Sequence, residues 1–174
     1  MHRYHGFKLL ELTFVLLLLG LLLNLGGQGL VGLVQTTQAR ATVHQIHTAF
    51  RLARQTAVEE RQLTTLCVLD ADNQCQADWQ GTLTVFLDPD NTRRLTDPAQ
   101  LVRQFELTAG VRLSTHPSIR AYHQYDLLGQ PRGATGGHVR ICPGGQLQEA
   151  ARIIIGPGGR TRVEWPDNTD STCS

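Results

Sequence analysis

Four cysteines are the most reactive residues of the chain, because thiols either bind metal ions or pair as disulfides. Only Cys67 and Cys75 lie close together, and no histidine flanks them at the spacing of zinc ligands. The spacing therefore favours disulfides and predicts no metal site. Of the three possible pairings we favour Cys67 with Cys75, closing a small turn, and Cys142 with Cys173, tying the last residues to a sheet. The sequence leaves the other two pairings open.

Two arginines near the end of the chain, in the stretch GRTR, could bind phosphate. Arg160 and Arg162 are two positions apart on a predicted strand, where side chains at i and i+2 share a face about 6.6 Å apart. Both guanidinium groups could then reach neighbouring phosphates of a nucleic-acid backbone. The alternative is ordinary edge-strand charge, which discourages aggregation.

Other chemical signals are missing from the sequence. GPGGRTR is rich in glycine but lacks the Lys-Ser/Thr pair of a phosphate-binding P-loop, and no helix pattern follows it. His116 and His123 are interpreted as scattered surface histidines rather than as catalytic bases. We therefore expect a protein that is not an enzyme and needs no metal or other cofactor.

The formal charge of +1 hides an uneven distribution. Residues 63–110 carry three arginines against seven acidic residues, whereas residues 111–162 carry seven arginines against two acidic residues. Arginine suits bidentate contacts with phosphate or carboxylate groups. The basic half therefore favours an anionic partner, although an ordinary solvated surface gives the same count.

An apolar stretch opens the chain and is long enough to span a membrane as a helix. It covers residues 7–25, and the cationic residues before it are expected to stay cytoplasmic, so that the rest faces an oxidising compartment. Glu11 lies inside this stretch, where an ionised group costs roughly 2.5 to 3.5 kcal/mol. Glu11 must therefore lie near an interface or have a partner.

A long helix and an antiparallel β domain are predicted after the apolar stretch. A glycine-rich segment at 26–34 should soften the helix, which continues as an amphipathic helix over 35–62. A basic stripe of unassigned role lies beside its apolar stripe, formed by Arg40, His44, His47, Arg51, Arg54 and Arg61. Residues 63–174 alternate between β-rich runs and turns, and predict a globular β domain packed on that helix. The expected strands are 63–69, 82–88, 104–108, 111–115, 119–125, 138–142, 151–155 and 160–165.

The start of the chain resembles the class III signal of type IV pilins and pseudopilins. A short basic leader ends at Gly6, Phe7 follows at once, and a glutamate stands at the fifth place from Phe7. The resemblance implies that a prepilin peptidase removes residues 1–6, cutting between Gly6 and Phe7, and methylates the new amino terminus. It also implies that Glu11 meets the amino terminus of a neighbouring subunit during filament assembly.

Most of the remaining chain resembles the GspH/FimT family of minor pilins. The matching segments are AFRLARQTAVEERQ, LCVLDADNQC, DWQG, VFLD and RIIIGPGGRTR, and residues 90–137 match only loosely. Trp79 and Phe86 of these segments are interpreted as core residues. The resemblance implies an α+β, type IV pilin-like fold with a long N-terminal helix packed on a C-terminal antiparallel β domain. It also implies a subunit that sits in the inner membrane with a periplasmic C-terminal domain and then enters a filament of other major and minor pilins.

FimT-like members of this family carry a GRxR motif that is associated with DNA binding during natural transformation. The motif falls here on Gly159, Arg160, Thr161 and Arg162, and Arg140 and Arg152 are expected beside it on adjacent strands. Binding of double-stranded DNA through phosphates would be largely independent of base sequence. The acidic residues after the motif, among them Glu164, depart from the family pattern. The alternative function is a structural minor pseudopilin of a type II secretion system with protein partners only.

Overall fold

The computed structural model describes residues 9–107, 110–116, 120–133, 136–142 and 151–165, leaving aside the side chains of 21–36. The chain divides into two compact units, Met1–Gln38 and Ala39–Ser174. One long helix, α1, is followed by eight strands in the described residues. The elements are α1 (Leu9–Glu59), β1 (Thr64–Val68), β2 (Thr82–Leu87), a 3-10 turn η1 (Pro98–Gln100), β3 (Leu101–Glu106), β4 (Arg112–His116), β5 (Tyr122–Tyr125), β6 (Gly137–Cys142), β7 (Ala151–Ile155) and β8 (Thr161–Glu164).

The first unit contains the N-terminal part of α1. The helix continues without interruption through the glycine-rich segment 26–34, so the softening expected there stays a prediction. Side chains of residues 9–20 are exposed, including Leu9, Leu10 and Phe14. No helix among the described residues has an apolar stretch long enough to cross a membrane. The predicted membrane segment 7–25 lies only partly among those residues.

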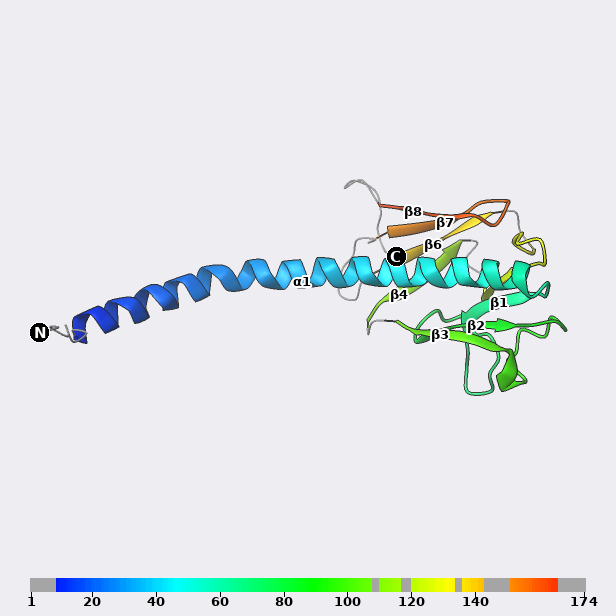
Figure 1. The fold of residues 1–174 in the computed structure, drawn as a ribbon, viewed down its shortest axis with the longest axis horizontal. Helices are drawn as coiled ribbons and strands as arrows, with labels where there is room; N and C mark the ends of the chain where they lie inside the picture. Colours follow the sequence, from blue (N-terminus) through cyan, green and yellow to red (C-terminus); the bar gives the residue numbers. More distant parts are fainter. Residues whose placement is uncertain (1–8, 108–109, 117–119, 134–135, 143–150, 166–174) are drawn as a thin grey trace, which may run out of the picture. The chain divides into compact units, whose positions relative to one another are not determined.

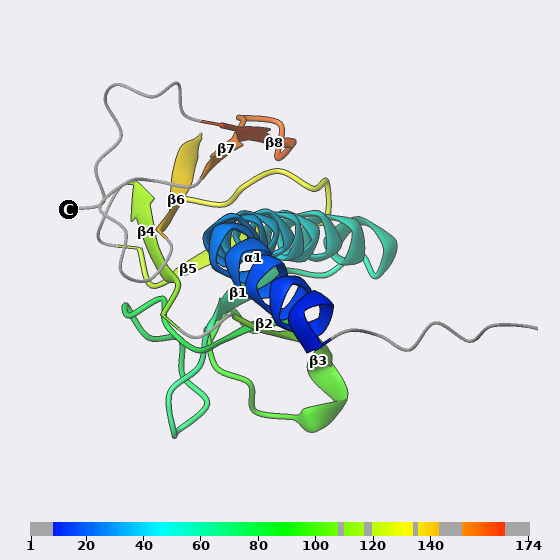
Figure 2. The same ribbon diagram turned by 90° about the vertical axis from the view of Figure 1, so that its left-hand side faces the viewer.

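The second unit places the end of α1 against two antiparallel sheets of four strands each. One sheet has the order β3-β2-β1-β5 and the other has the order β4-β6-β7-β8. Figures 1 and 2 show β1 to β3 on one side of this part of the helix and β6 to β8 on the other. The basic stretch 111–162 supplies all of the second sheet except the last two residues of β8.

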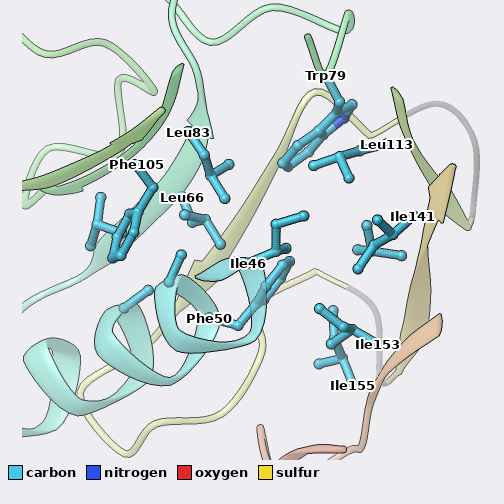
Figure 3. Close-up of a cluster of buried hydrophobic side chains, with 14 of the residues drawn as sticks. Ile46, Phe50, Leu66, Trp79, Leu83, Phe105, Leu113, Ile141, Ile153 and Ile155 are labelled. Atoms are coloured by element: carbon cyan, nitrogen blue, oxygen red, sulfur yellow. The ribbon is translucent and has the colours of Figure 1, made fainter. Parts of the chain in front are cut away.

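The hydrophobic core lies where this part of α1 meets both sheets. Ile46 and Phe50 of the helix are fully buried, in one cluster with Leu66 of the first sheet and with Ile141 and Ile153 of the second (Figure 3). Strand β7 alternates between buried and half-buried residues, as expected for a sheet with one face on a core. Burying each large apolar side chain stabilises the fold by roughly 1.5 to 3 kcal/mol.

The predicted fold class is confirmed, and the structure adds how the strands divide between sheets. All eight expected strands are present within a few residues of their predicted bounds. They form two sheets, because among the described strands β4 pairs with β6 alone while β5 returns to pair with β1. Trp79 and Phe86 are buried, as predicted, and the indole Nε1 of Trp79 donates to the carbonyl oxygen of Arg120 at 2.8 Å.

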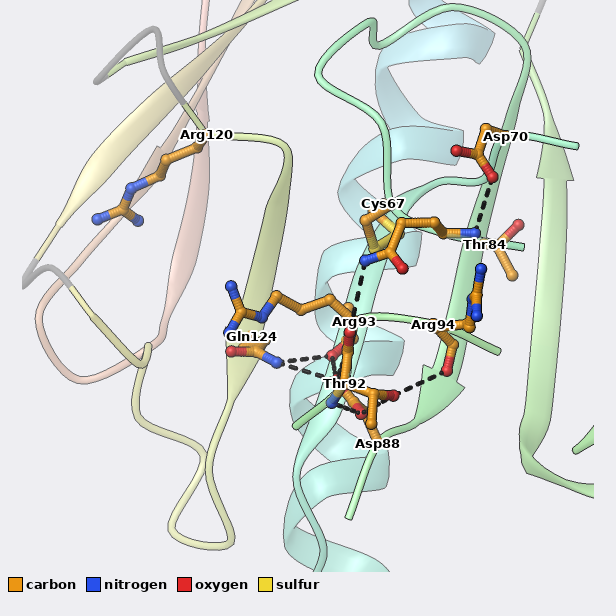
Figure 4. The surroundings of a disulfide bond; sticks show 12 residues. Cys67, Asp70, Thr84, Asp88, Thr92, Arg93, Arg94, Arg120 and Gln124 are labelled. Atoms are coloured by element: carbon orange, nitrogen blue, oxygen red, sulfur yellow. Dashed lines mark hydrogen bonds between the residues drawn. A yellow bond between two sulfur atoms is a disulfide. The ribbon is translucent and has the colours of Figure 1, made fainter. Parts of the chain in front are cut away.

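A disulfide and a buried carboxylate fix loops that flank the first sheet (Figure 4). Cys67 and Cys75 are bonded as predicted, with a Cα–Cα distance of 5.6 Å. The carboxylate of Asp88 accepts hydrogen bonds from the hydroxyl of Thr65 at 2.8 Å and from the side-chain nitrogen of Gln124 at 3.1 Å. Asp88 also accepts from the backbone nitrogens of Thr92 and Arg93, which satisfies a carboxylate that is 2% exposed.

Candidate functional site

The outer face of the second sheet carries the arginines expected to contact phosphate. Arg140 of β6 lies directly opposite Arg152 of β7, and Arg152 lies directly opposite Glu164 of β8. Residues directly opposite each other in an antiparallel pair share a face, so these three side chains form one row across the sheet. Arg162 stands in the neighbouring row, opposite Ile154. The expected adjacency of Arg140, Arg152 and Arg162 is therefore present, while their role stays a prediction.

Arg162 is held by an acidic residue of its own strand. Its Nε and Nη2 both donate to Oε1 of Glu164, at 2.9 and 2.7 Å. Both side chains are well exposed, at 69% for Arg162 and 44% for Glu164. An exposed ion pair of this kind contributes about 0 to 1 kcal/mol, so an incoming anion can compete with it.

The glycine of the GRTR motif is required by the backbone. Gly159 has φ +75°, and a Cβ built on it would overlap the carbonyl oxygen of Gly129. Gly129 itself has φ +72°, and its own Cβ would come within 2.9 Å of Val58 on α1. Three segments far apart in the sequence therefore meet so closely that side chains are excluded at both glycines.

Arg160 has different surroundings from Arg162. It lines a pocket of about 550 Å³ together with Arg51 and Arg54 of α1. Arg160 and Arg51 are exposed, and Arg54 is half-buried, with its Nε donating to the carbonyl oxygen of Gly129 at 3.0 Å. The two arginines of the motif are thus used differently, one at this pocket and one in an ion pair.

The basic stripe of α1 lies along the edge of the second sheet. The ring of His44 contacts the ring of Trp165, with centroids 6.4 Å apart, just after β8. A ring nitrogen of His47 lies 3.3 Å from the carbonyl oxygen of Thr161. Arg51 and Arg54 line the same pocket as Arg160, so this part of the stripe and the motif form one basic surface within the second unit.

Histidines of the second unit fall into two environments. His116 and His138 lie opposite each other on the outer face of the second sheet, with stacked rings 4.9 Å apart.

His123 is buried, which corrects its interpretation as a surface histidine, and its ring lies against Phe50 and Trp79. Burial, with a smaller effect of the charge on Arg120, lowers the pKa of His123 to about 3. Burial also raises the pKa of Tyr125. Among the described residues, no cluster of His, Cys, Asp or Glu is arranged to hold a metal ion.

Several predicted site residues lie at or beyond the edge of the described part. Glu11 is exposed in the first turn of α1, where a carboxylate interacts favourably with the helix dipole. Gly6 and Phe7, the predicted cleavage site, lie outside the described residues. Cys142 is disulfide-bonded, and its predicted partner Cys173 also lies outside them.

Sequence reasoning pointed to Glu164 as an acidic residue beside the motif but missed how the basic surface is assembled. The pairing of Arg162 with Glu164 carries a local signal, since residues i and i+2 of a strand share a face. The contact of Gly159 with Gly129 carries none, because 30 residues separate them and no rule links the two turns. The meeting of Arg160 with Arg51 likewise depends on how α1 packs beside β8.

Comparisons with known proteins identify the fold and its relatives. The family model for type II transport protein GspH matches residues 42–159. The type IV minor pilin FimU of Pseudomonas aeruginosa has 16% identity and a TM-score of 0.56, over 74% of this chain and 89% of that chain. The minor pseudopilin EpsH from the type II secretion system of Vibrio cholerae has 17% identity and a TM-score of 0.51, over 78% and 99%. A search of curated protein sequences gives no match.

Proposed function

The chain belongs to the family of type II transport protein GspH, and we propose that it is a minor pilin that binds DNA. At the family level it is a minor pilin or pseudopilin of a type IV pilus or of a type II secretion system. Minor pilins and pseudopilins assemble with other pilins in a filament. The specific proposal is a type IV pilus subunit that contacts double-stranded DNA through phosphates and serves DNA uptake in natural transformation.

The observation that supports DNA binding is the concentration of arginine on one sheet. Arg140, Arg152 and Arg162 share the outer face of the sheet β4-β6-β7-β8, and Arg160 stands at the turn before β8. The only acidic residue of these four strands is Glu164. Phosphate contacts dominate non-specific affinity for DNA, so a surface of this kind suits a partner of any base sequence.

The route of the subunit into the filament is the second part of the proposal. Prepilin peptidase would remove residues 1–6 and methylate Phe7, and the segment 7–25 would hold the protein in the inner membrane with residues beyond it in the periplasm. Support comes from the exposed apolar side chains of residues 9–20, since such surfaces mark membrane or protein contacts. Sequencing the mature amino terminus tests this step, and a start other than methylated Phe7 would contradict it.

Glu11 is proposed to guide assembly rather than membrane insertion. After cleavage it lies one helical turn from the new positive charge at Phe7, and it can meet the amino terminus of a neighbouring subunit. We expect Glu11→Ala to leave the protein in the membrane fraction and to lower its amount in sheared pili. Glu11→Asp serves as the control, since it keeps the charge. Equal incorporation of the alanine variant and the wild type would remove this role.

DNA binding is tested by titrating labelled duplex DNA into the full-length protein in zwitterionic detergent at several salt concentrations. Replacing both Arg160 and Arg162 with glutamine should flatten the slope of log affinity against log salt by about 2, since each phosphate contact contributes about 0.9. The matched control replaces Arg94 and Arg103, two exposed arginines outside the basic sheet. An equal loss in both double variants would show a general charge effect and would contradict the proposed site.

A structural pseudopilin with protein partners only is the second candidate function. The ion pair between Arg162 and Glu164 favours it, because one arginine of the motif is already neutralised within the chain. This candidate predicts no measurable DNA binding by the wild type at 50 mM salt. The same titration therefore separates the two functions before any variant is made.

A further inference from the structure

The pocket beside Arg160 has a strongly uneven lining. Three arginines contribute to it, Arg51 and Arg54 from α1 and Arg160 from the turn before β8. The single acidic residue of the lining is Glu59, whose Oε1 accepts a hydrogen bond from the side chain of Gln55 at 2.8 Å. The pocket therefore carries an excess of positive charge that an anion would neutralise.

The walls of this pocket are held in place by contacts that do not involve any ligand. Arg54 donates from Nε to the carbonyl oxygen of Gly129 at 3.0 Å, and Gly159 packs against the same carbonyl group. The turn that carries Gly129 is fixed by Asp126, whose Oδ1 accepts from the backbone nitrogens of Leu128 and Gln130 at 3.0 and 2.8 Å. A site with rigid walls loses less entropy when it binds.

The arginines of the pocket differ from Arg162 in how their charge is compensated. Within the part of the chain that the structure describes, the guanidinium groups of Arg51 and Arg160 make no hydrogen bond or ion pair. Arg162, by contrast, is bonded twice to Glu164. Of the two arginines of the motif, the one whose charge is not paired with an acidic residue is therefore Arg160, at the pocket.

We propose that this pocket binds a phosphate group, held by Arg51, Arg54 and Arg160. Guanidinium groups match the oxygens of phosphate with paired donors, and three arginines line this one pocket. Val58 and Leu128 form an apolar part of the lining that suits the sugar carbons next to a backbone phosphate. That the phosphate belongs to DNA rests on the proposed function. The DNA-binding surface then extends from β8 onto α1.

Arg51 gives the sharpest test, because it is exposed and its replacement should leave the fold intact. In full-length protein in zwitterionic detergent, Arg51→Gln should weaken binding of a labelled DNA duplex about fivefold at 0.1 M salt. Arg40→Gln is the matched control, since Arg40 is exposed on the same helix and does not line the pocket. It should change the affinity less than twofold. If the two variants lose affinity equally, or Arg51→Gln binds like the wild type, α1 is not part of the DNA surface.

A double-mutant cycle tests whether Arg51 and Arg160 hold the same group. The combined variant Arg51→Gln and Arg160→Gln should lose less affinity than the product of the two single losses, because each single change already weakens the shared phosphate contact. Losses that multiply would assign the two arginines to separate phosphates and would overturn the shared site.

Titration with inorganic pyrophosphate tests the phosphate site without DNA. It therefore separates failure of this proposal from failure of the proposed DNA binding. At constant ionic strength it should shift the backbone amide resonances of Gly129, Gly159 and Arg160, but not that of Arg103, and Arg51→Gln should weaken the effect. Absence of these shifts overturns the phosphate site. Shifts in a wild type that does not bind DNA would retain the pocket as a site for free phosphate and reject DNA as its ligand.

Discussion

Replacing Gly159 with alanine should destabilise the second unit through the backbone, independently of any ligand. Gly159 has φ +75°, and alanine there costs about 1 to 2 kcal/mol relative to its preferred conformations. The added Cβ would also overlap the carbonyl oxygen of Gly129, so the two turns must separate. Forced displacement of packed groups costs roughly 1 to 3 kcal/mol more. The expected loss in the free energy of unfolding is therefore about 2 to 5 kcal/mol.

Urea denaturation of residues 39–174 measures this loss, because that unit contains the whole described hydrophobic core. Gly158→Ala is the matched control in the same turn. Gly158 lies outside the left-handed region, and a Cβ on it would meet no atom within 4 Å. The control should stay within about 0.5 kcal/mol of the wild type. A Gly159→Ala variant as stable as the Gly158→Ala variant would refute the close approach of the two turns.

Three further predictions follow from particular contacts of the second unit. Glu164→Gln should raise DNA affinity up to about fivefold in the titration, because Arg162 loses an exposed ion pair worth at most about 1 kcal/mol. Glu106→Gln, outside the basic sheet, is the control. A similar gain in that variant would show an effect of net charge and would contradict this reason. His123→Leu should reduce acid destabilisation. Folding lowers the pKa of His123 from 6.5 to about 3, so this histidine's contribution is complete above pH 6.5 and decreases as the pH falls towards 3. The wild type should therefore lose about 2.5 kcal/mol more than the variant between pH 7 and pH 4.5 in urea denaturation, and parallel losses would contradict a buried neutral imidazole. Replacing Cys67 and Cys75 with serine should lower the free energy of unfolding by about 2.5 kcal/mol, from a disulfide loop with a sequence separation of 8, and an unchanged urea midpoint would contradict this.

The strands could be predicted from the sequence because each is a short β-rich run between turn residues. Their partners could not, because pairing depends on contacts between distant segments. Strand β1 is buried along its whole length, so its residues do not alternate between buried and exposed. Its sequence pattern therefore does not show which face of the strand packs on the helix. The return of β5 to β1 places His123 opposite Leu66, and this pairing buries a side chain that looks like a surface histidine in the sequence.

The candidate site could be predicted only where it depends on local sequence patterns. Arg140, Arg152 and Arg162 were expected on adjacent strands, and antiparallel pairing of neighbouring runs does bring them together. The helical stripe was also visible from its spacing of three and four residues. What joins the stripe to the motif is the packing of α1 beside β8, seen in Arg54 bonding to Gly129 and His47 lying near Thr161. No local pattern encodes a contact between such distant segments.

Three residues of GRTR contribute to a binding surface by different physical means, so variants at the three positions should have different effects. Gly159 acts through the backbone, so its replacement lowers stability and with it any binding. Arg160 acts at a pocket whose charge is uncompensated, and its loss should be felt directly as lost affinity. Arg162 must first leave Glu164, so its net contribution is the small difference between two exposed ion pairs. Arg160→Gln should therefore weaken DNA binding more than Arg162→Gln does. In a Glu164→Gln background, Arg162→Gln should have the larger effect only if Arg162 lies closer to the DNA backbone than Arg160.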